Sequence, residues 1–168
     1  EEMLYEISEK TMKLESEGKK ITKLNLGDPD QPTPNEIIEA AFKAMKQGKT
    51  KYSSSAGEKK LREELASIHN VSPENVVITT GSKWAIFSLM FSLVKKGENV
   101  VLPTPHWTAY ELTAKSLGAE TRFLKTTLDS GWKIDVGKLG GLIDKKTRLI
   151  ILNNPNNPTS KVIEDKVL

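Results

Sequence analysis

Apolar residues recur along the chain with two periods, one typical of helices and one typical of strands. In the first third of the chain they recur every three or four residues among many charges. This spacing predicts an amphipathic helix over 1–20, a helix that begins at residues 33–36, and a third helix over 58–69. Residues 21–26 alternate instead, which predicts a short strand that runs into a turn at Gly27.

The second helix has a clear start signal. Thr33 is placed to cap it, Pro34 suits the first helical position and Glu36 completes a capping box. We expect the second and third helices each to bury one apolar face. The residues expected on these faces are Ile37, Ile38, Ala41, Phe42 and Met45 in the second helix, and Leu61, Leu65 and Ile68 in the third.

From residue 76 onward, short apolar runs and helical segments alternate. The runs predict strands over 76–80, 99–102, 120–124 and 148–152, of which the last is the most apolar. The segments between them predict helices over 82–96, 108–117 and 136–143, with Leu89, Met90, Leu93 and Val94 buried in the first of these. Alternation of this kind predicts an α/β fold with three layers, in which a mostly parallel sheet carries helices on both faces.

Composition excludes several classes of protein. The chain has 168 residues, 28% of them charged, and no cysteine. The lack of cysteine excludes a disulfide scaffold, a thiolate zinc site and a cysteine nucleophile, and it agrees with a cytoplasmic location. No apolar run approaches the ~18 residues of a membrane span, and the acidic start differs from a signal peptide. We therefore expect no membrane association.

The net charge of +3 does not indicate a nucleic-acid partner. Of 25 basic residues only Arg62, Arg122 and Arg148 are arginines, and the lysines are scattered among acids. Nucleic-acid sites favour clustered arginines with interleaved aromatic residues. We interpret the positive residues as a solvated surface.

Ligands of parallel α/β sheets collect at the carboxyl ends of strands, so the residues after each predicted strand are the candidates for a site. Gly81, Ser82 and Lys83 open a helix whose N–H groups and positive dipole end favour an anion. Ser82 as a plain helix cap is an equal alternative. The segment is not a P-loop, and no G-x-G-x-x-G fingerprint of a dinucleotide fold is present.

Two further segments follow predicted strands. Trp107 can stack on a flat cofactor ring, although a tryptophan that fills a gap in the core is commoner. His106 is better interpreted as a polar loop residue, because the chain's two isolated histidines cannot form a zinc site. In the run over 153–160, two Asn-Pro pairs require an extended, rigid backbone, from which an asparagine amide can donate to a phenolate-like oxygen.

Together these segments resemble class I and II aminotransferases, which are pyridoxal 5′-phosphate (PLP) enzymes of fold type I, and most closely the aspartate aminotransferase-like branch. The resemblance extends from about Leu24 to the end of the chain. Its motifs are Leu26-Gly27-Asp28-Pro29-Asp30, residues 51–57 with Leu61-Arg62, Thr80-Gly81-Ser82-Lys83, Pro105-His106-Trp107 with Tyr110, and Asn157-Pro158-Thr159. Ser160 departs from the glycine that usually follows Asn-Pro-Thr.

The resemblance implies a role for each matching residue. Gly81, Ser82 and Lys83 would bind the PLP phosphate. Trp107 would stack on the pyridine ring, and Asn157 would hydrogen-bond the ring hydroxyl oxygen. Tyr52 would reach the phosphate of the other subunit's cofactor, which implies a homodimer with shared sites, and Gly27 would lie near the substrate carboxylate.

The activity implied is ping-pong transamination, in which an amino group passes from an amino acid, of the aspartate, aromatic or alanine type, to the cofactor and then to a 2-oxo acid. In the family, the Schiff-base lysine, the acidic partner of the pyridine nitrogen and the arginine that binds the substrate carboxylate all lie downstream of Asn-Pro-Thr. No lysine of this chain matches the catalytic one. We therefore expect no catalytic residue here, and expect the chain to be an N-terminal portion that is inactive alone.

This resemblance divides the chain into an N-terminal arm or small-domain segment over 1–30 and an incomplete PLP-binding large domain over 31–168. Two alternatives stay open. The chain can be a non-catalytic module that binds phosphate or a partner protein, or it can belong to a related PLP lyase or synthase on the same scaffold. A nucleotide-binding domain ranks third, because its glycine fingerprint is absent.

Overall fold

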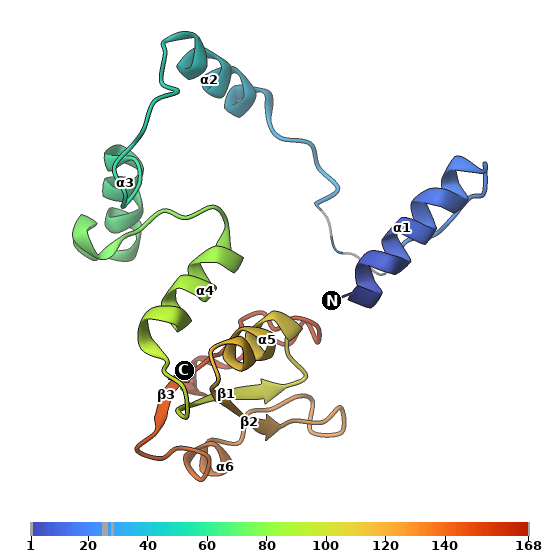
Figure 1. Cartoon of the computed structure of the whole chain (residues 1–168), viewed down its shortest axis with the longest axis vertical. Coiled ribbons are helices and arrows are strands. Elements are labelled where there is room, and N and C mark those ends of the chain that lie inside the picture. The colour runs from blue at the N-terminus through green and yellow to red at the C-terminus, as the bar shows by residue number, and fades with distance from the viewer. Residues whose placement is uncertain (1, 25–26, 28, 168) are drawn as a thin grey trace. The chain divides into compact units, whose positions relative to one another are not determined.

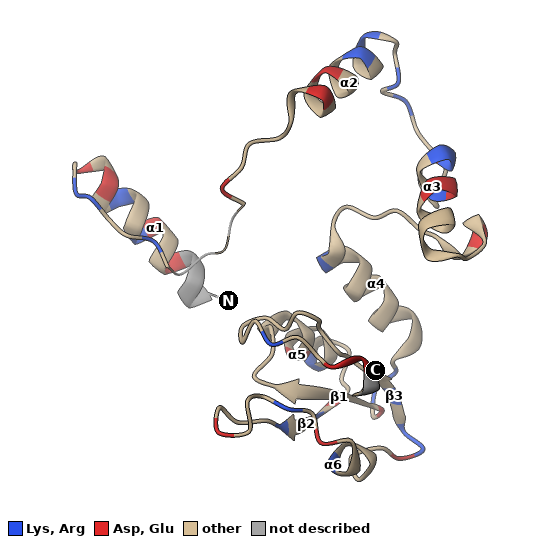
Figure 2. Ribbon diagram, turned by 180° about the vertical axis from the view of Figure 1, so that it is seen from behind, with Lys and Arg blue, Asp and Glu red and all other residues tan. Residues whose placement is uncertain are grey.

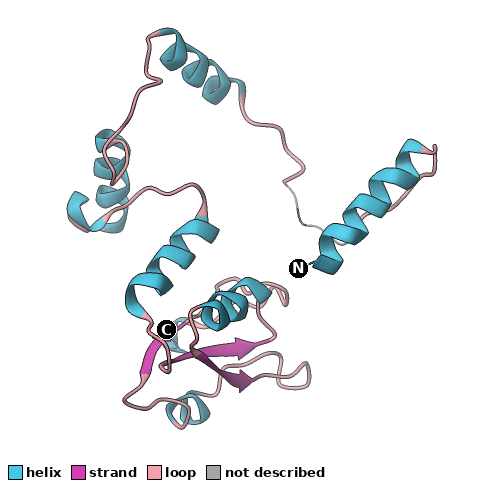
Figure 3. Cartoon of the chain, viewed as in Figure 1, coloured by secondary structure: helices cyan, strands magenta, loops and turns pink. Residues whose placement is uncertain are grey.

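The chain forms two structural units. The computed structural model describes residues 2–24, 27 and 29–167, and the contacts within it divide the chain into Glu1–Ile78 and Thr79–Leu168 (Figure 1). All the elements described in the first unit are helices, and those described in the second are helices and strands (Figure 3). The sequence predicted this change of period at residue 76, close to the division.

The three α-helices of the first unit lie close to where the sequence predicts them. They are α1 (Glu2–Ser16), α2 (Asn35–Lys46) and α3 (Lys59–His69), and a short 3-10 helix that was not predicted, η1 (Pro73–Asn75), follows. Basic and acidic residues both occur on α1, α2 and α3 (Figure 2). Mixed signs on each helix agree with a solvated surface rather than a patch of one charge.

The predicted cap of α2 is wrong. The residue that caps this helix is Pro34, and no side chain accepts a hydrogen bond there, so Thr33 does not act as the cap. The predicted burial of the apolar faces is also wrong for most positions. Ile37, Ile38, Phe42 and Met45 are 52–58% exposed, and Leu61 and Ile68 of α3 are exposed as well. A helical apolar period shows that a face can be covered, whereas burial needs a neighbour that covers it.

Two predicted strands are absent from the described residues. Residues 21–24 form no strand, and Asn25 and Leu26 lie outside the described residues. Val76 has extended backbone, with φ −115° and ψ 126°, but residues 76–79 form no ladder with any described strand. The amide of Ile78 donates to the carbonyl of Ala56 in a loop instead, over 2.9 Å. A β-branched run becomes a strand only where a second strand completes its hydrogen bonds.

Within residues 79–167, three strands form one parallel sheet. The elements of this unit are α4 (Ser82–Leu93), β1 (Asn99–Thr104), α5 (Thr108–Ser116), β2 (Glu120–Lys125), α6 (Val136–Gly140), β3 (Thr147–Ile150) and the 3-10 helix η2 (Asp165–Val167). The strand order is β2-β1-β3, with Val100 opposite Thr121 on one side and Leu149 on the other.

The strand order places helices on both faces of the sheet. The chain moves from β1 to β2 through α5 and then back past β1 to β3 through α6. Because both crossovers of a parallel sheet are right-handed and these two run in opposite directions, their helices lie on opposite faces. Figure 1 shows α5 above the strands and α6 below them. The predicted three-layer α/β fold is confirmed.

The core of this unit is built around β1. Val100, Val101 and Leu102 have no exposed surface, because this strand has a neighbour on each edge and helices over it. The residues that pack with it are Met90 of α4, Val94 directly after α4, and Tyr110 and Ala114 of α5. Burial of Met90 and Val94 is as predicted, but Leu89 and Leu93 are 54% and 47% exposed, contrary to prediction. The most apolar run forms β3, which is an edge strand. Its residues alternate between half-buried and exposed.

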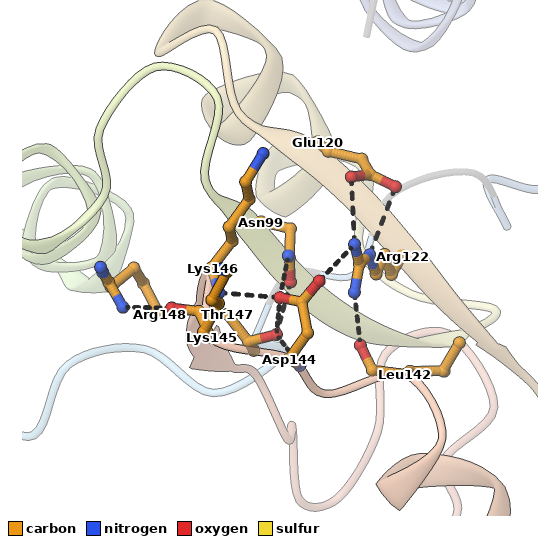
Figure 4. Close-up of polar contacts among 9 residues, drawn as sticks. All are labelled: Asn99, Glu120, Arg122, Leu142, Asp144, Lys145, Lys146, Thr147 and Arg148. Carbon is orange, nitrogen blue, oxygen red and sulfur yellow. Dashed lines mark hydrogen bonds and ion pairs between the residues drawn. The ribbon is translucent and has the colours of Figure 1, made fainter.

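A polar cluster joins the amino ends of the strands (Figure 4). Asn99 is fully buried; its amide donates to Asp144 Oδ1 over 3.0 Å, and its Oδ1 accepts from the Thr147 hydroxyl over 2.7 Å. Arg122 lies between Glu120 and Asp144, with 2.9 Å from Nη2 to Asp144 Oδ2. The Asn99 amide, together with the Lys146 N–H and Arg122, lowers the pKa of Asp144 to about 2. This cluster ties the turn before β3 to β1 and β2.

Candidate functional site

The first turn of α4 contains the predicted phosphate-binding residues. Gly81 caps the helix in a conformation with φ +86°, which favours glycine, and no side chain bonds to the first helical N–H groups as a cap. Ser82 is the first helical residue and not the cap, so its alternative role as a plain N-cap is wrong. Lys83 is the one basic residue of α4 and lies at its amino end (Figure 2). The positive end of the dipole of this twelve-residue helix also lies at its amino end, beside Lys83.

Trp107 lies next to this turn in space. Its ring centroid is 5.6 Å from Lys83 Nζ, which is within the range of a cation–π contact. The same ring meets Tyr110 edge-on at 5.4 Å, and burial raises the pKa of that tyrosine. Trp107 is half-buried and packs partly against the core. The two interpretations of this tryptophan, core residue and stacking platform, are therefore compatible, because one part of the ring is covered and another is accessible.

The loop after β3 is held by asparagine side chains. Asn156 Nδ2 donates to the carbonyl of Pro105 over 3.2 Å and to Thr159 Oγ1 over 2.9 Å, which fixes the loop to the segment that carries Trp107. Asn154 Oδ1 accepts from the N–H of Ile163 over 2.9 Å. Asn157 is exposed. The sequence indicated a rigid run of asparagines but did not separate these roles.

Ser160 stands at a backbone position suited to glycine. Its φ is +55°, in the left-handed region, and its N–H donates to the carbonyl of Asn156 over 2.8 Å. The turn at Ser160 is therefore closed by a hydrogen bond. The left-handed conformation is energetically unfavourable for a residue that carries a side chain.

His106 is a structural residue of the loop, as the sequence suggested. Its Nδ1 lies 3.0 Å from the carbonyl of Trp107, its ring stacks on Phe123 at 5.7 Å, and its Nε2 is 3.8 Å from Glu111 Oε2. In the described part of the chain, no three His, Asp or Glu side chains are grouped so that they could hold a metal ion.

A cavity lies at the carboxyl ends of the strands. Pro103 and Pro105 at the end of β1 line it, as do Asn153 and Asn156 of the loop after β3. Its lining includes His106 and Asn156, which directly precede Trp107 and Asn157 in the chain, but neither Trp107 nor Asn157. The cavity thus adjoins the predicted cofactor residues and does not coincide with them.

Tyr52 and Gly27 belong to the first unit. The Tyr52 side chain is fully exposed, and Gly27 is exposed with no atom within 4 Å of the position of an added Cβ. Leu26 and Asp28, which complete the motif around Gly27, lie outside the described residues. In the second unit the structure brings Lys83 next to Trp107, whereas Asn157 is exposed and it is its neighbour Asn156 that contacts the segment of Trp107. Tyr52 and Gly27 are described separately from these residues.

Known proteins are similar to this chain in sequence and in fold. The profile of the family described as aminotransferase class I and II matches residues 19–168. The chain is 33% identical over 168 residues to the aspartate/prephenate aminotransferase of Thermus thermophilus, covering 96% of this chain and 44% of that relative. It is 34% identical over 161 residues to the (5-formylfuran-3-yl)methyl phosphate transaminase of Methanocaldococcus jannaschii, covering 92% of this chain and 41% of that one.

Solved structures agree. An aspartate aminotransferase from Thermus thermophilus with maleate superposes with a TM-score of 0.93 at 32% identity, covering 98% of this chain and 44% of that one. An alanine aminotransferase from Pyrococcus furiosus gives 0.90 at 27% identity, covering 99% and 45%. The chain belongs to the class I and II aminotransferase family. It spans less than half the length of these relatives.

No helix in the described ranges is both long and apolar enough to cross a membrane.

Proposed function

We propose that the second unit is part of a PLP site in an aminotransferase that transfers an amino group between an amino acid and a 2-oxo acid. Membership of a family that is generally PLP-dependent supports this proposal. The observation that carries it is the juxtaposition of Lys83, at the amino end of α4, with the ring of Trp107. A cation and a helix end beside an accessible aromatic face suit a ligand that combines a phosphate with a flat ring.

The backbone at Gly81 fits such a ligand as well. A Cβ added there would meet no atom within 4 Å, so the space beside this residue is open. The first N–H groups of a helix have no acceptor within the helix and can donate to a phosphate. The N–H groups at the start of α4, together with Lys83, therefore suit an anionic group such as a phosphate.

Each residue then has a distinct task. When bound, PLP supplies an electron-withdrawing ring that stabilises negative charge next to the amino acid's Cα. The turn at Gly81, Ser82 and Lys83 would hold the phosphate, and Trp107 would orient the ring. Asn157 would donate its amide to the ring hydroxyl oxygen and favour the ionised form of that oxygen.

The remaining predicted residues act at the borders of the site. Gly27 would lie near the substrate carboxylate. Tyr52 would reach the phosphate bound by a second copy of the chain, in a homodimer. In this proposal residues 1–30 are an arm or small-domain segment, and 31–168 belong to the large domain. The cytoplasmic location stays a prediction.

We infer aspartate or alanine as the amino donor, because the similar proteins carry the names aspartate/prephenate, aspartate and alanine aminotransferase. An aromatic donor stays a prediction from the sequence resemblance. We also infer that residues 1–168 bind PLP without transaminating. The family's Schiff-base lysine lies downstream of Asn-Pro-Thr, and no residue of 1–168 matches it.

Titration with PLP tests the proposal. Added PLP should quench the tryptophan fluorescence of the chain, and Trp107→Phe should remove most of the quenching. Trp132→Phe is the matched control, because Trp132 is also a half-buried loop tryptophan. Equal effects of the two substitutions would contradict the assignment of Trp107. Turnover with a panel of amino donors, or a borohydride-trapped lysine adduct, would contradict the inferred lack of activity.

A further inference from the structure

The loop that carries Tyr52 is a tight turn in the first unit. Residues 53–57 connect this tyrosine to α3. The N–H of Gly57 donates to the carbonyl of Ser54 over 2.8 Å, and the N–H of Ala56 contacts the Ser54 hydroxyl at 3.3 Å. Such a turn has a defined shape, but bonds within the loop do not determine its orientation.

Ile78 fixes the loop from outside. Its N–H donates to the carbonyl of Ala56 over 2.9 Å. A Cβ added at Gly57 would lie 2.5 Å from Ile78 Cβ and 2.6 Å from its Cγ1. Gly57 also has φ +102°, in the region that favours glycine. The isoleucine therefore occupies the space that any side chain at position 57 would need.

Arg62 of α3 in turn holds the segment that leads to Ile78. Its Nε donates to the carbonyl of Val76 over 2.8 Å, and its Nη2 donates to the carbonyl of Pro73 over 2.6 Å. The charge of Arg62 also contributes, after the Ser72 hydrogen bond and a backbone hydrogen bond, to lowering the pKa of Glu74 in the same turn. A guanidinium can direct two donors at two fixed carbonyls, which a lysine ammonium does less rigidly.

We propose that Gly57, Arg62 and Ile78 form a positioning brace that sets the orientation in which Tyr52 is presented. This inference rests on the proposed function, in which Tyr52 contacts the cofactor phosphate of a second copy. None of the three brace residues needs to touch the cofactor. Each acts through the loop: Arg62 fixes the backbone before Ile78, and Ile78 fixes the backbone of the loop through Ala56 and Gly57.

Amide hydrogen exchange of the full chain tests the brace directly. In Arg62→Met and Arg62→Lys, the amide of Ile78 should exchange about tenfold faster, because the backbone that leads to this donor is no longer held. The amides of β1 should keep their rates. Lys60→Met is the matched control, since Lys60 is an exposed residue of the same helix. An Ile78 amide that is unprotected in the unchanged chain, or that stays protected in both Arg62 variants, overturns the proposal.

A second measurement connects the brace to Tyr52. We expect Tyr52→Phe and Arg62→Lys each to weaken PLP binding several-fold, and the double variant to bind no more weakly than either single one. Additive losses in the double variant would overturn the positioning role. If Tyr52→Phe leaves PLP affinity unchanged while exchange at Ile78 responds to Arg62, the proposed role of Tyr52 fails and the brace stands.

Discussion

The ammonium of Lys83 lies 5.6 Å from the centre of the Trp107 ring, so the first turn of α4 and the residue before α5 meet although 24 positions separate them in the chain. This contact places a cation beside an aromatic face at the amino ends of two helices. A single ligand could therefore place a phosphate at Lys83 and a flat ring against Trp107.

Lys83→Met should weaken binding of PLP about tenfold, because the phosphate loses a charged hydrogen-bond donor. Pyridoxal, which lacks the phosphate, should lose much less affinity. Fluorescence titration of both compounds measures the difference. Lys115→Met, which removes an exposed lysine of α5, should change neither affinity. Equal losses for PLP and pyridoxal would show that Lys83 does not contact the phosphate.

Ser160→Gly should stabilise the chain by about 0.5–1 kcal/mol. The left-handed conformation of Ser160 destabilises the folded chain, and glycine adopts this conformation without strain. Glycine also raises the conformational entropy of the unfolded chain, but this effect is the smaller one. Urea unfolding measures the change. Ser160→Val should have the opposite sign, since β-branching makes φ +55° less accessible. Destabilisation by glycine would mean that the serine hydroxyl contributes to the turn.

The polar cluster at the amino ends of the strands should make stability depend on pH through Asp144. Its pKa in the folded chain is about 2, below the ordinary 3.8, so the folded state holds the proton less tightly than the unfolded state. The stabilisation is complete above about pH 4 and is lost as the pH falls toward about 2. Asp144→Asn should therefore lower the unfolding temperature above pH 4 and matter little near pH 2.

Asp129→Asn is the control for this experiment, because Asp129 is an exposed loop carboxylate outside the cluster. Thermal unfolding of both variants, followed from pH 2 to pH 7, separates the cluster from a general effect of removing one negative charge. A constant difference between Asp144→Asn and the unchanged chain over this range would contradict the pKa argument.

Leu102→Ala should cost about 2–5 kcal/mol of unfolding free energy, because it removes a fully buried side chain from the central strand. Phe91→Ala on α4 is the comparison. Phe91 is the larger side chain but is 66% exposed, so its loss should cost less than about 1 kcal/mol. A large cost at Phe91 would show that the exposed apolar face of α4 is covered in solution.

Much of the site could be predicted from the chain because its motifs are local. Gly81, Ser82 and Lys83 are adjacent, and their position at a helix start follows from the period of the residues around them. The separate roles of the asparagines could not be predicted in this way. Asn156 reaches back 51 residues to Pro105, and Asn157 beside it stays exposed, because the loop turns between them. The role of Arg62 could not be predicted either, because its acceptors at Val76 and Pro73 become its neighbours only after folding.

The sequence by itself determined the kind and order of most helices and strands, because periodicity and turn residues act over a few positions. The tertiary structure alone decided which strand is central. β3 is the more apolar run, yet β1 is the buried strand over its first four residues, because the crossovers bring a neighbour to both of its edges. It also decided that residues 76–79 form no strand and that α2 leaves its apolar face exposed. A pattern states what a segment can bury or pair with, and only the other segments in space can supply the partner.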